Sequence, residues 1–359
     1  MVALTSVLPP WLDVPLRRAL ALRSAHALLL HGPDGNAQFD LAIALAQALL
    51  CETSDQSVRL IGACGACPGC RLVEVRTHPD LLSLVPDSMR EALGWPAADS
   101  ESPSGASVPK AKPSNEIRVD DAREAVTFAQ TTSARGRGRV VLVHPAESMN
   151  DIAANALLKT LEEPPGTTRF ILSTHAAGSL LPTIRSRCSG IMVGLPAPEN
   201  ALEWLSTNGV AEPAVLLRAA GGRPQEALEW SRTGFGSAHW LELPGLAAQG
   251  RVDNFAQCPL PRLIRMLQKI CHDCMCVAVA APPRYFPAKS LTMSADLPRL
   301  TAWAVALRRH AEQADHPWQA ALKTDALIRE AQRALQSAEG QDRAQLRSAK
   351  GRASIHSRP

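Results

Sequence analysis

Short apolar runs that alternate with helical patterns constrain the fold of this sequence more than any other feature does. Four runs have the length and composition of strands that are buried on both faces: 27–32, 80–86, 139–145 and 169–174. Helical patterns separate them: 36–51, 117–134 and 151–163. Asn36 is a candidate N-cap of the first helix. This alternation predicts an α/β domain over residues 1–195, with a mostly parallel sheet and helices on both faces.

The rest of the chain reads as helical. Residues 196–236 are predicted to form a small helical domain, and the Ala- and Leu-rich residues 237–340 a helical bundle. Residues 86–116 are rich in Pro, Ser and Ala and have little to bury, so they are predicted to be a disordered insertion between strands. Residues 341–359 are predicted to be a disordered basic tail.

The charge of the chain gives no support for a nucleic-acid-binding class. The formal net charge of +4 equals the excess of Lys and Arg in 341–359, so the remainder is neutral. No apolar run approaches the roughly 20 residues that a membrane span needs, and the N-terminus has no signal-peptide pattern. We therefore expect a cytoplasmic protein without a membrane partner, whose nine cysteines do not form a disulfide framework.

Four cysteines near the N-terminus have the spacing of metal ligands. Cys64, Cys67 and Cys70 form a C-x-x-C-x-x-C pattern, and Cys51 lies upstream. Four thiolates make a closed tetrahedral site, which is typical of structural zinc, and such a site can fold a module (residues 51–77) that is poor in apolar residues. Two alternatives remain: an iron–sulfur cluster, although no Cys-Pro follows, and unrelated free cysteines.

A second group of cysteines, Cys271, Cys274 and Cys276 beside His272, lies in an apolar helical stretch. At helical spacing these side chains do not all face one ligand position. They are predicted to be small buried apolar side chains rather than a metal site.

The loop HGPDGNAQF lies between the first predicted strand and helix, where a phosphate-binding loop is expected. A functional loop reads G-x-x-x-x-G-K-[ST]. Gly32 and Gly35 keep its frame, but Ala37, Gln38 and Phe39 replace the last glycine, the lysine that reaches the phosphates and the hydroxyl that binds magnesium. This degenerate loop is predicted not to bind a nucleotide.

Four segments in order, HGPDGNAQF, the cysteine module, ANALLKTLEEPPGTTRFILST and LPTIRSRC, resemble the delta-prime family of bacterial DNA polymerase III clamp-loader subunits, which are AAA+ proteins. The resemblance is dense over about residues 20–195. It implies an AAA+ module with an inserted zinc module, a small helical lid domain and an α-helical C-terminal collar domain. It also implies a non-catalytic, stator-like subunit whose partners are gamma/tau and delta subunits, and which reaches the sliding clamp and primed DNA through the complex.

The resemblance allows two further ATPase positions to be checked. The strand at 139–145 should be followed by an acidic pair that holds magnesium, but His144 and Pro145 stand there. In the lid, the family's arginine position holds Gln225, with Arg223 nearby. Together with the loop, these departures imply that the subunit binds no ATP and has no catalytic residues of its own.

The SRC motif, by contrast, is kept as Ser186, Arg187 and Cys188. In the family this arginine points across a subunit interface to the γ-phosphate of a neighbour's ATP, so the resemblance implies an arginine finger that acts in trans. Glu162 and Glu163 end the helix before two prolines, where acidic residues oppose the helix dipole. An inter-subunit contact and a solvated helix end are both consistent with that position.

Two other functions were considered. An ATP-hydrolysing gamma/tau-type subunit is opposed by the missing lysine and carboxylates. A zinc-dependent nucleic-acid-binding regulator, from a different class, is opposed by the neutral body of the chain.

Overall fold

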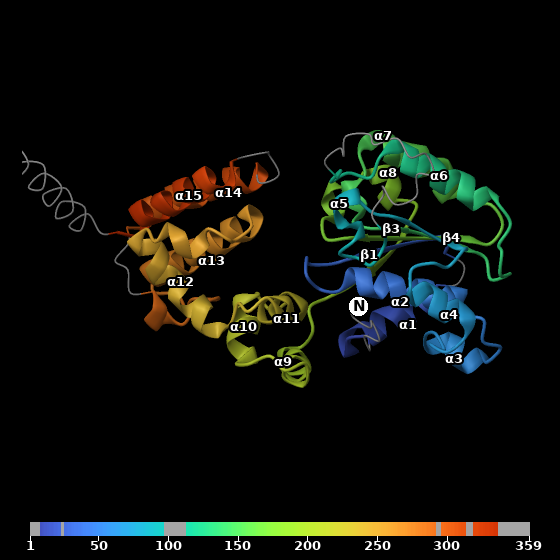
Figure 1. The fold of residues 1–359 in the computed structure, drawn as a ribbon, viewed down its shortest axis with the longest axis horizontal. Coiled ribbons are helices and arrows are strands. Elements are labelled where there is room, and N and C mark those ends of the chain that lie inside the picture. The colour runs from blue at the N-terminus through green and yellow to red at the C-terminus, as the bar shows by residue number, and fades with distance from the viewer. Residues whose placement is uncertain (1–7, 23–24, 97–112, 292–295, 314–318, 337–359) are drawn as a thin grey trace, which may run out of the picture. The chain divides into compact units, whose positions relative to one another are not determined.

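The computed structural model describes residues 8–22, 25–96, 113–291, 296–313 and 319–336. It contains two compact units, residues 1–200 and 201–359, and each is described here by itself (Figure 1). The predicted basic tail and residues 97–112 of the predicted insertion lie outside the described residues.

The first unit is built on a five-stranded sheet with the order β2-β3-β4-β1-β5, in which all paired strands are parallel. Its strands are β1 (Ala27–His31), β2 (Leu81–Leu84), β3 (Arg139–Val143), β4 (Thr168–Thr174) and β5 (Ser189–Met192). The sequence predicted the first four of these strands. The chain enters β5 only after crossing from β4 to the far side of β1, which places a topological switch point at β1.

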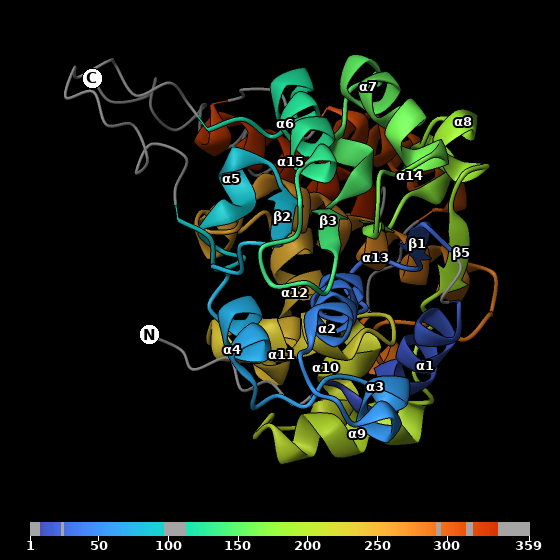
Figure 2. The ribbon, with the colours of Figure 1, turned by 90° about the vertical axis from the view of Figure 1, so that its right-hand side faces the viewer.

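Helices cover both faces of the sheet (Figures 1 and 2). One face carries α1 (Asp13–Ala21), α2 (Gln38–Leu50), α3 (Gln56–Ile61) and α4 (Pro68–Glu74); the other carries α5 (Asp87–Arg90), α6 (Val119–Gln130), α7 (Asp151–Glu162) and α8 (Pro182–Arg185). Alternate residues of β1 pack into the two separate cores: Leu28 and Leu30 into the core that includes α2, and Leu29 into the core that includes α6 and α7.

Helix α2 corrects one prediction. Its N-cap is Ala37, which has a left-handed backbone (φ 65°), and not Asn36. The Asn36 side chain is fully buried and donates its amide to the carbonyls of Val193 and Gly194. Asn36 is therefore unavailable as a cap because it binds the chain that leaves β5.

The predicted disorder of residues 86–116 is wrong for residues 87–96. This stretch forms α5 and then buries Trp95, whose ring lies edge-on to Phe39 with 5.8 Å between centroids. The guanidinium of Arg76 lies 5.1 Å from the Trp95 ring centre. One large aromatic side chain with a place to pack is enough to order a segment whose composition is otherwise polar.

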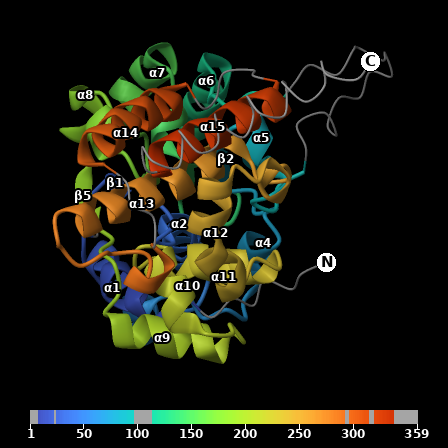
Figure 3. The same cartoon turned by 90° about the vertical axis from the view of Figure 1, so that its left-hand side faces the viewer.

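The second unit is helical (Figure 3). Its helices are α9 (Pro198–Thr207, which begins in the first unit), α10 (Pro213–Ala219), α11 (Pro224–Arg232), α12 (Ser237–Gln249), α13 (Leu260–Ala278), α14 (Leu297–Glu312) and α15 (Ala320–Leu335). One hydrophobic core extends from Ala201 to Leu335, so both predicted helical domains contribute to it. The predicted fold class, an α/β domain followed by a helical region, is confirmed.

Two predictions about side chains can be compared with this unit. Cys271 and Cys274 are buried in its core, as predicted, while Cys276 is only partly buried. Among the described residues, no helix has the length and apolarity needed to cross a membrane.

Candidate functional site

The phosphate-loop frame lies at the carboxyl end of β1, at the switch point where α/β sheets bind ligands. Its glycines are required by the backbone. A Cβ on Gly32 would lie 2.1 Å from the Val193 carbonyl oxygen, and Gly35 has a φ of 72°. The frame is thus explained by the close passage of the chain after β5, without any ligand.

Asn36 holds that passing chain. Its Nδ2 donates to the Val193 oxygen at 3.0 Å and also to the Gly194 oxygen. Its Oδ1 is buried without a hydrogen-bond partner. An orphan acceptor at this place disfavours a phosphate group, which brings more acceptors and no donor.

Gln38 and Phe39 close the loop from within. The Gln38 amide is buried and donates to the Pro33 carbonyl at 2.6 Å, so it turns back into the loop instead of reaching outward as a lysine would. The Phe39 ring packs on His144 with 4.8 Å between centroids. The two positions that would flank magnesium in an ATPase are therefore joined by an aromatic contact.

His144 follows β3 and is uncharged near neutral pH. Burial lowers its pKa to about 4, and its Nδ1 lies 2.8 Å from the Ser173 hydroxyl. Sequence reasoning overlooked Glu147, a carboxylate a few residues further along. Burial alone raises the pKa of Glu147, but its hydrogen bond with His175 lowers the pKa to about 2. Its Oε1 lies 2.6 Å from His175 Nδ1, so this carboxylate is already engaged.

The four cysteines of the N-terminal cluster, Cys51, Cys64, Cys67 and Cys70, converge on one point. Their sulfur atoms all lie within 4.8 Å of one another, and two pairs are 3.9 Å apart. A tetrahedron with Zn–S bonds of about 2.3 Å has sulfur–sulfur edges of about 3.8 Å. All four thiols are free of disulfides. The cluster therefore has the dimensions of a metal site such as a zinc site.

Backbone N–H groups stabilise the sulfurs of this cluster. The amides of Glu52, Cys64, Cys67 and Cys70 each donate to a cysteine sulfur at 3.4 Å. Hydrogen bonds from the amides of Ala66 and Cys67 lower the pKa of Cys64 to about 6, whereas burial raises the pKa of Cys70. The donors favour thiolates, and burial of Cys51 and Cys70 leaves little access for water.

A loop before β3 fastens the cysteine module, and no pattern in the sequence signalled it. Arg135 forms an ion pair with Glu52, and Arg137 donates to the carbonyls of Glu52 and Thr53. The loop itself is held by Asp80, a buried carboxylate that accepts from the amides of residues 134 and 135. The module is therefore tied to the end of β2 and the start of β3.

The SRC motif lies between α8 and β5. Ser186 is exposed and Cys188 is partly buried, and burial raises the pKa of Cys188 to about 12. The Arg187 side chain bonds to Glu162 Oε2 through Nε (3.1 Å) and Nη2 (2.8 Å), and to the Thr183 carbonyl through Nη1 (3.1 Å). The sequence singled out Arg187 and Glu162 separately; the structure brings them together across 25 residues.

The lid position considered in the sequence lies in the second unit. Arg223 forms an ion pair with Glu226 and donates through Nε to the Ala220 carbonyl at 2.9 Å. Its guanidinium is thus used within the helical unit. Gln225 lies beside it in the first turn of α11.

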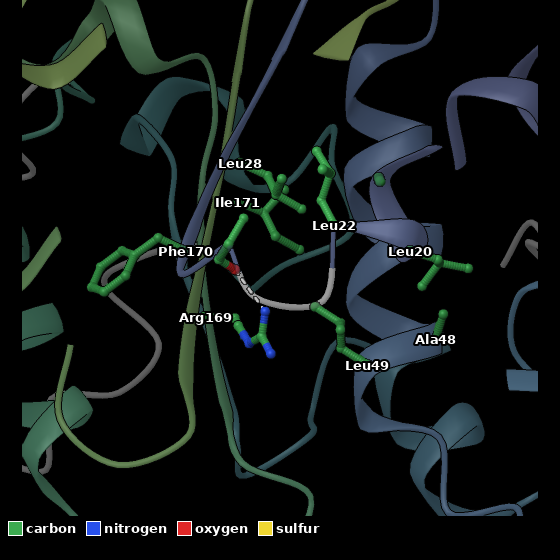
Figure 4. Close-up of a pocket in the computed structure, with 10 residues that line it drawn as sticks. Leu20, Leu22, Leu28, Ala48, Leu49, Arg169, Phe170 and Ile171 are labelled. Atoms are coloured by element: carbon green, nitrogen blue, oxygen red, sulfur yellow. Dashed lines mark hydrogen bonds between the residues drawn. The ribbon is translucent and has the colours of Figure 1, made fainter. Parts of the chain in front are cut away.

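A cavity of about 220 Å³ lies at the opposite, amino end of the sheet (Figure 4). Its walls are mostly apolar and include Leu20, Leu28 and Leu49, and its charged side chain is Arg169. The Arg169 guanidinium donates to the Ala25 carbonyl at 2.6 Å. With no carboxylate, thiol or imidazole in its wall, this cavity has no groups for acid–base or nucleophilic chemistry.

A second group of possible ligands, His272, Asp273 and Cys276, lies on α13. The buried Asp273 carboxylate already accepts from three backbone amides, those of residues 284, 285 and 286, at 2.7–2.8 Å. It also contacts His272 Nδ1 at 2.9 Å. Asp273 therefore serves to order the segment that follows α13.

Comparison with known proteins adds a family to this geometry. The family model described as "DNA polymerase III, delta subunit" matches residues 16–195, which is half of the chain. The matched segment includes the degenerate loop, the four-cysteine cluster and the SRC motif.

Individual relatives carry related descriptions. The DNA polymerase III subunit delta' of Pseudomonas aeruginosa is 41% identical over 207 residues, which cover 56% of this chain and 55% of that protein. The subunit delta' of Escherichia coli is 34% identical over 226 residues, 61% of this chain and 59% of that protein. The E. coli subunit tau is 31% identical over 166 residues, 46% and 21% of the two chains. The match to the delta' relatives thus spans little more than half of their length.

Proposed function

Since this chain belongs to the DNA polymerase III delta-subunit family, as one of its delta′ subunits, we propose that it is a non-catalytic, stator-like subunit of a clamp loader. In this role it assembles with gamma/tau and delta subunits and helps to load a sliding clamp onto primed DNA in chromosomal replication. The similarity to a tau subunit over nearly half of the chain supports a common architecture for neighbours in one complex.

The absence of ATP chemistry in this subunit is supported by one observation above all. Gln38 and Phe39 fill the loop from inside, through a bond to the Pro33 carbonyl and a ring contact to His144. A nucleotide would have to displace both contacts and would then find neither lysine nor magnesium ligands. The observation also opposes the alternative of an ATP-hydrolysing subunit.

Structural zinc is the second part of the proposal. The residues that would hold it are Cys51, Cys64, Cys67 and Cys70, whose sulfurs already have near-tetrahedral spacing. Four protein ligands leave no open position for water or substrate, so the metal would contribute folding energy to the module rather than catalysis.

Arg187 is the residue that we propose acts in trans. It is partly exposed, belongs to the matched SRC segment and has the planar donor fork that suits a γ-phosphate. At a neighbour's ATP it would offset the negative charge that develops during phosphoryl transfer.

The test is a reconstituted clamp loader that carries Arg187→Ala. Assembly should survive, because the side chain is half exposed, and clamp- and DNA-stimulated ATP hydrolysis should fall. Arginine fingers contribute on the order of a thousandfold or more at one site, but the loss for the whole complex will be smaller because other interfaces keep their own arginines. Arg185→Ala is the matched control and should be milder. Normal hydrolysis and loading by a fully assembled Arg187→Ala complex would contradict the role in trans.

A further inference from the structure

We propose that Glu162 is a positioning residue that holds Arg187 ready for a neighbour's ATP; this inference rests on the proposed function of Arg187. The pair is not a sequence-local contact, because Glu162 ends α7 and Arg187 follows α8. Those two helices pack on each other within the first unit. The bond therefore fixes the arginine relative to the body of the α/β domain.

The donors of Arg187 are divided in a way that favours positioning. A guanidinium has five N–H groups. Two of them, on Nε and Nη2, point to Glu162 Oε2, and a third, on Nη1, points to the Thr183 carbonyl. Beyond these three bonds, one N–H remains on each terminal nitrogen. Two such N–H groups form the fork that binds a pair of phosphate oxygens.

The helix dipole gives an independent reason for the carboxylate to be there. Glu162 is the last residue of α7, where a negative charge is unfavourable by about 0.3–1 kcal/mol at an exposed site. The bond to Arg187 offsets that cost. Glu163, the next residue, is exposed and takes no part in the bonds to Arg187. The two adjacent glutamates thus differ in the one property that the proposal concerns.

The size of the expected effect follows from exposure. The side chains of Arg187 and Glu162 are 30% and 59% exposed, and exposed ion pairs contribute about 0.2–1 kcal/mol. Converted to a rate, this is a fall of about 1.4- to 5-fold in the part of the hydrolysis rate that depends on Arg187. Because the pair contributes so little to folding, its loss should leave the stability of the chain nearly unchanged.

The experiment compares Glu162→Gln with Glu163→Gln in the reconstituted complex, and Arg187→Ala defines the Arg187-dependent part of the rate. Glu162→Gln should lower kcat for that part about 1.4- to 5-fold, with KM for ATP and the thermal midpoint unchanged, and Glu163→Gln should match the wild type. In the Arg187→Ala background, Glu162→Gln should cause no further loss, because its effect passes through Arg187.

The outcomes separate this inference from the proposed function. If Arg187→Ala lowers hydrolysis while the two glutamate variants behave alike, only the positioning role is overturned. A rate that rises in Glu162→Gln also overturns it, since Glu162 would then compete with the phosphate for the arginine. If Arg187→Ala itself has no effect, the role in trans fails and the positioning role fails with it.

Discussion

Helix α2 has a motif at each end, and the two motifs differ in what their polar groups are bonded to. At its start, the phosphate-loop frame directs Asn36 and Gln38 into backbone carbonyls of this same chain. At its end, Cys51 joins three other thiols that converge with no disulfide among them. A nucleotide site is expected at the first place and a metal site at the second. Only the second place presents a convergent set of groups suited to its ligand.

This difference shows why the spacing of a motif and the capacity to bind a ligand are separate properties. The glycines of the loop keep their spacing because the chain after β5 passes within a Cβ radius of Gly32. The cysteines keep theirs although the module has almost no core of its own, and two of the four thiols are only partly buried. Without a ligand, four facing thiols would bring no stability to the module.

The largest effect should come from removing the metal. Purified protein should contain about one zinc per chain, and Cys70→Ser or chelation should abolish amide-exchange protection in residues 52–75, because structural zinc contributes on the order of 10 kcal/mol to small modules. Elemental analysis and hydrogen exchange measure both quantities. Cys276→Ser is the control and should leave zinc content and exchange of the module unchanged. A brown, iron-containing protein would favour the cluster alternative and break the comparison.

A smaller effect should come from acid at the closed loop. The pKa of His144 falls from 6.5 to about 4 on folding, so between these values the unfolded chain binds a proton that the native chain does not. Its contribution to stability is complete above pH 6.5 and is lost as the pH falls toward 4, by at most about 3 kcal/mol. Glu147, His175 and Asp34 also act on this histidine.

Denaturant unfolding of the wild type and of His144→Gln at a series of pH values measures the difference. The variant should lose the part of the pH slope between pH 6.5 and 4 that His144 causes. If the two slopes are equal, the His144–Phe39 contact is not what closes the loop.

The smallest expected effect is the sharpest test of the closed end. Gln38→Lys restores the lysine of the motif but leaves Phe39 in place of the hydroxyl and His144 in place of a carboxylate. Calorimetry with MgATP should therefore detect no tight binding by the wild type or by Gln38→Lys, with Gln38→Ala as the size control. Micromolar binding by any of them would show that the loop can open, and would return the ATPase alternative to consideration.

Local patterns carried most of the sequence prediction, and long-range contacts account for its failures. Four strands were found because each is a long apolar run, whereas β5 was missed because SGIM is short and contains a glycine. The cysteine cluster was found because its spacing is itself the signal. Asn36 was misassigned because its partners lie more than 150 residues away. Trp95 was hidden in a polar segment, and nothing along the chain links it to Phe39.

The site residues show the same division. Arg187 was found through its motif, and Glu162 was noticed only because its charge opposes the helix dipole. Their bond depends on how α7 and α8 pack, which no sequence period encodes. Glu147 was overlooked because the expected carboxylate position was read at His144 and Pro145, while its engagement by His175 depends on β3 and β4 being neighbours.

The contact between Gly32 and Val193 has a consequence for how such loops age in evolution. A loop that has lost its nucleotide should drift, because nothing selects its glycines any longer. Here a methyl group at residue 32 would strike the backbone of residue 193, and loss of the Asn36 amide would leave two carbonyls of the same exit segment without their donor. Mutations at these positions are therefore harmful whether or not ATP is ever bound. A search for nucleotide sites that reads only glycine spacing will keep recovering this chain long after the chemistry has gone.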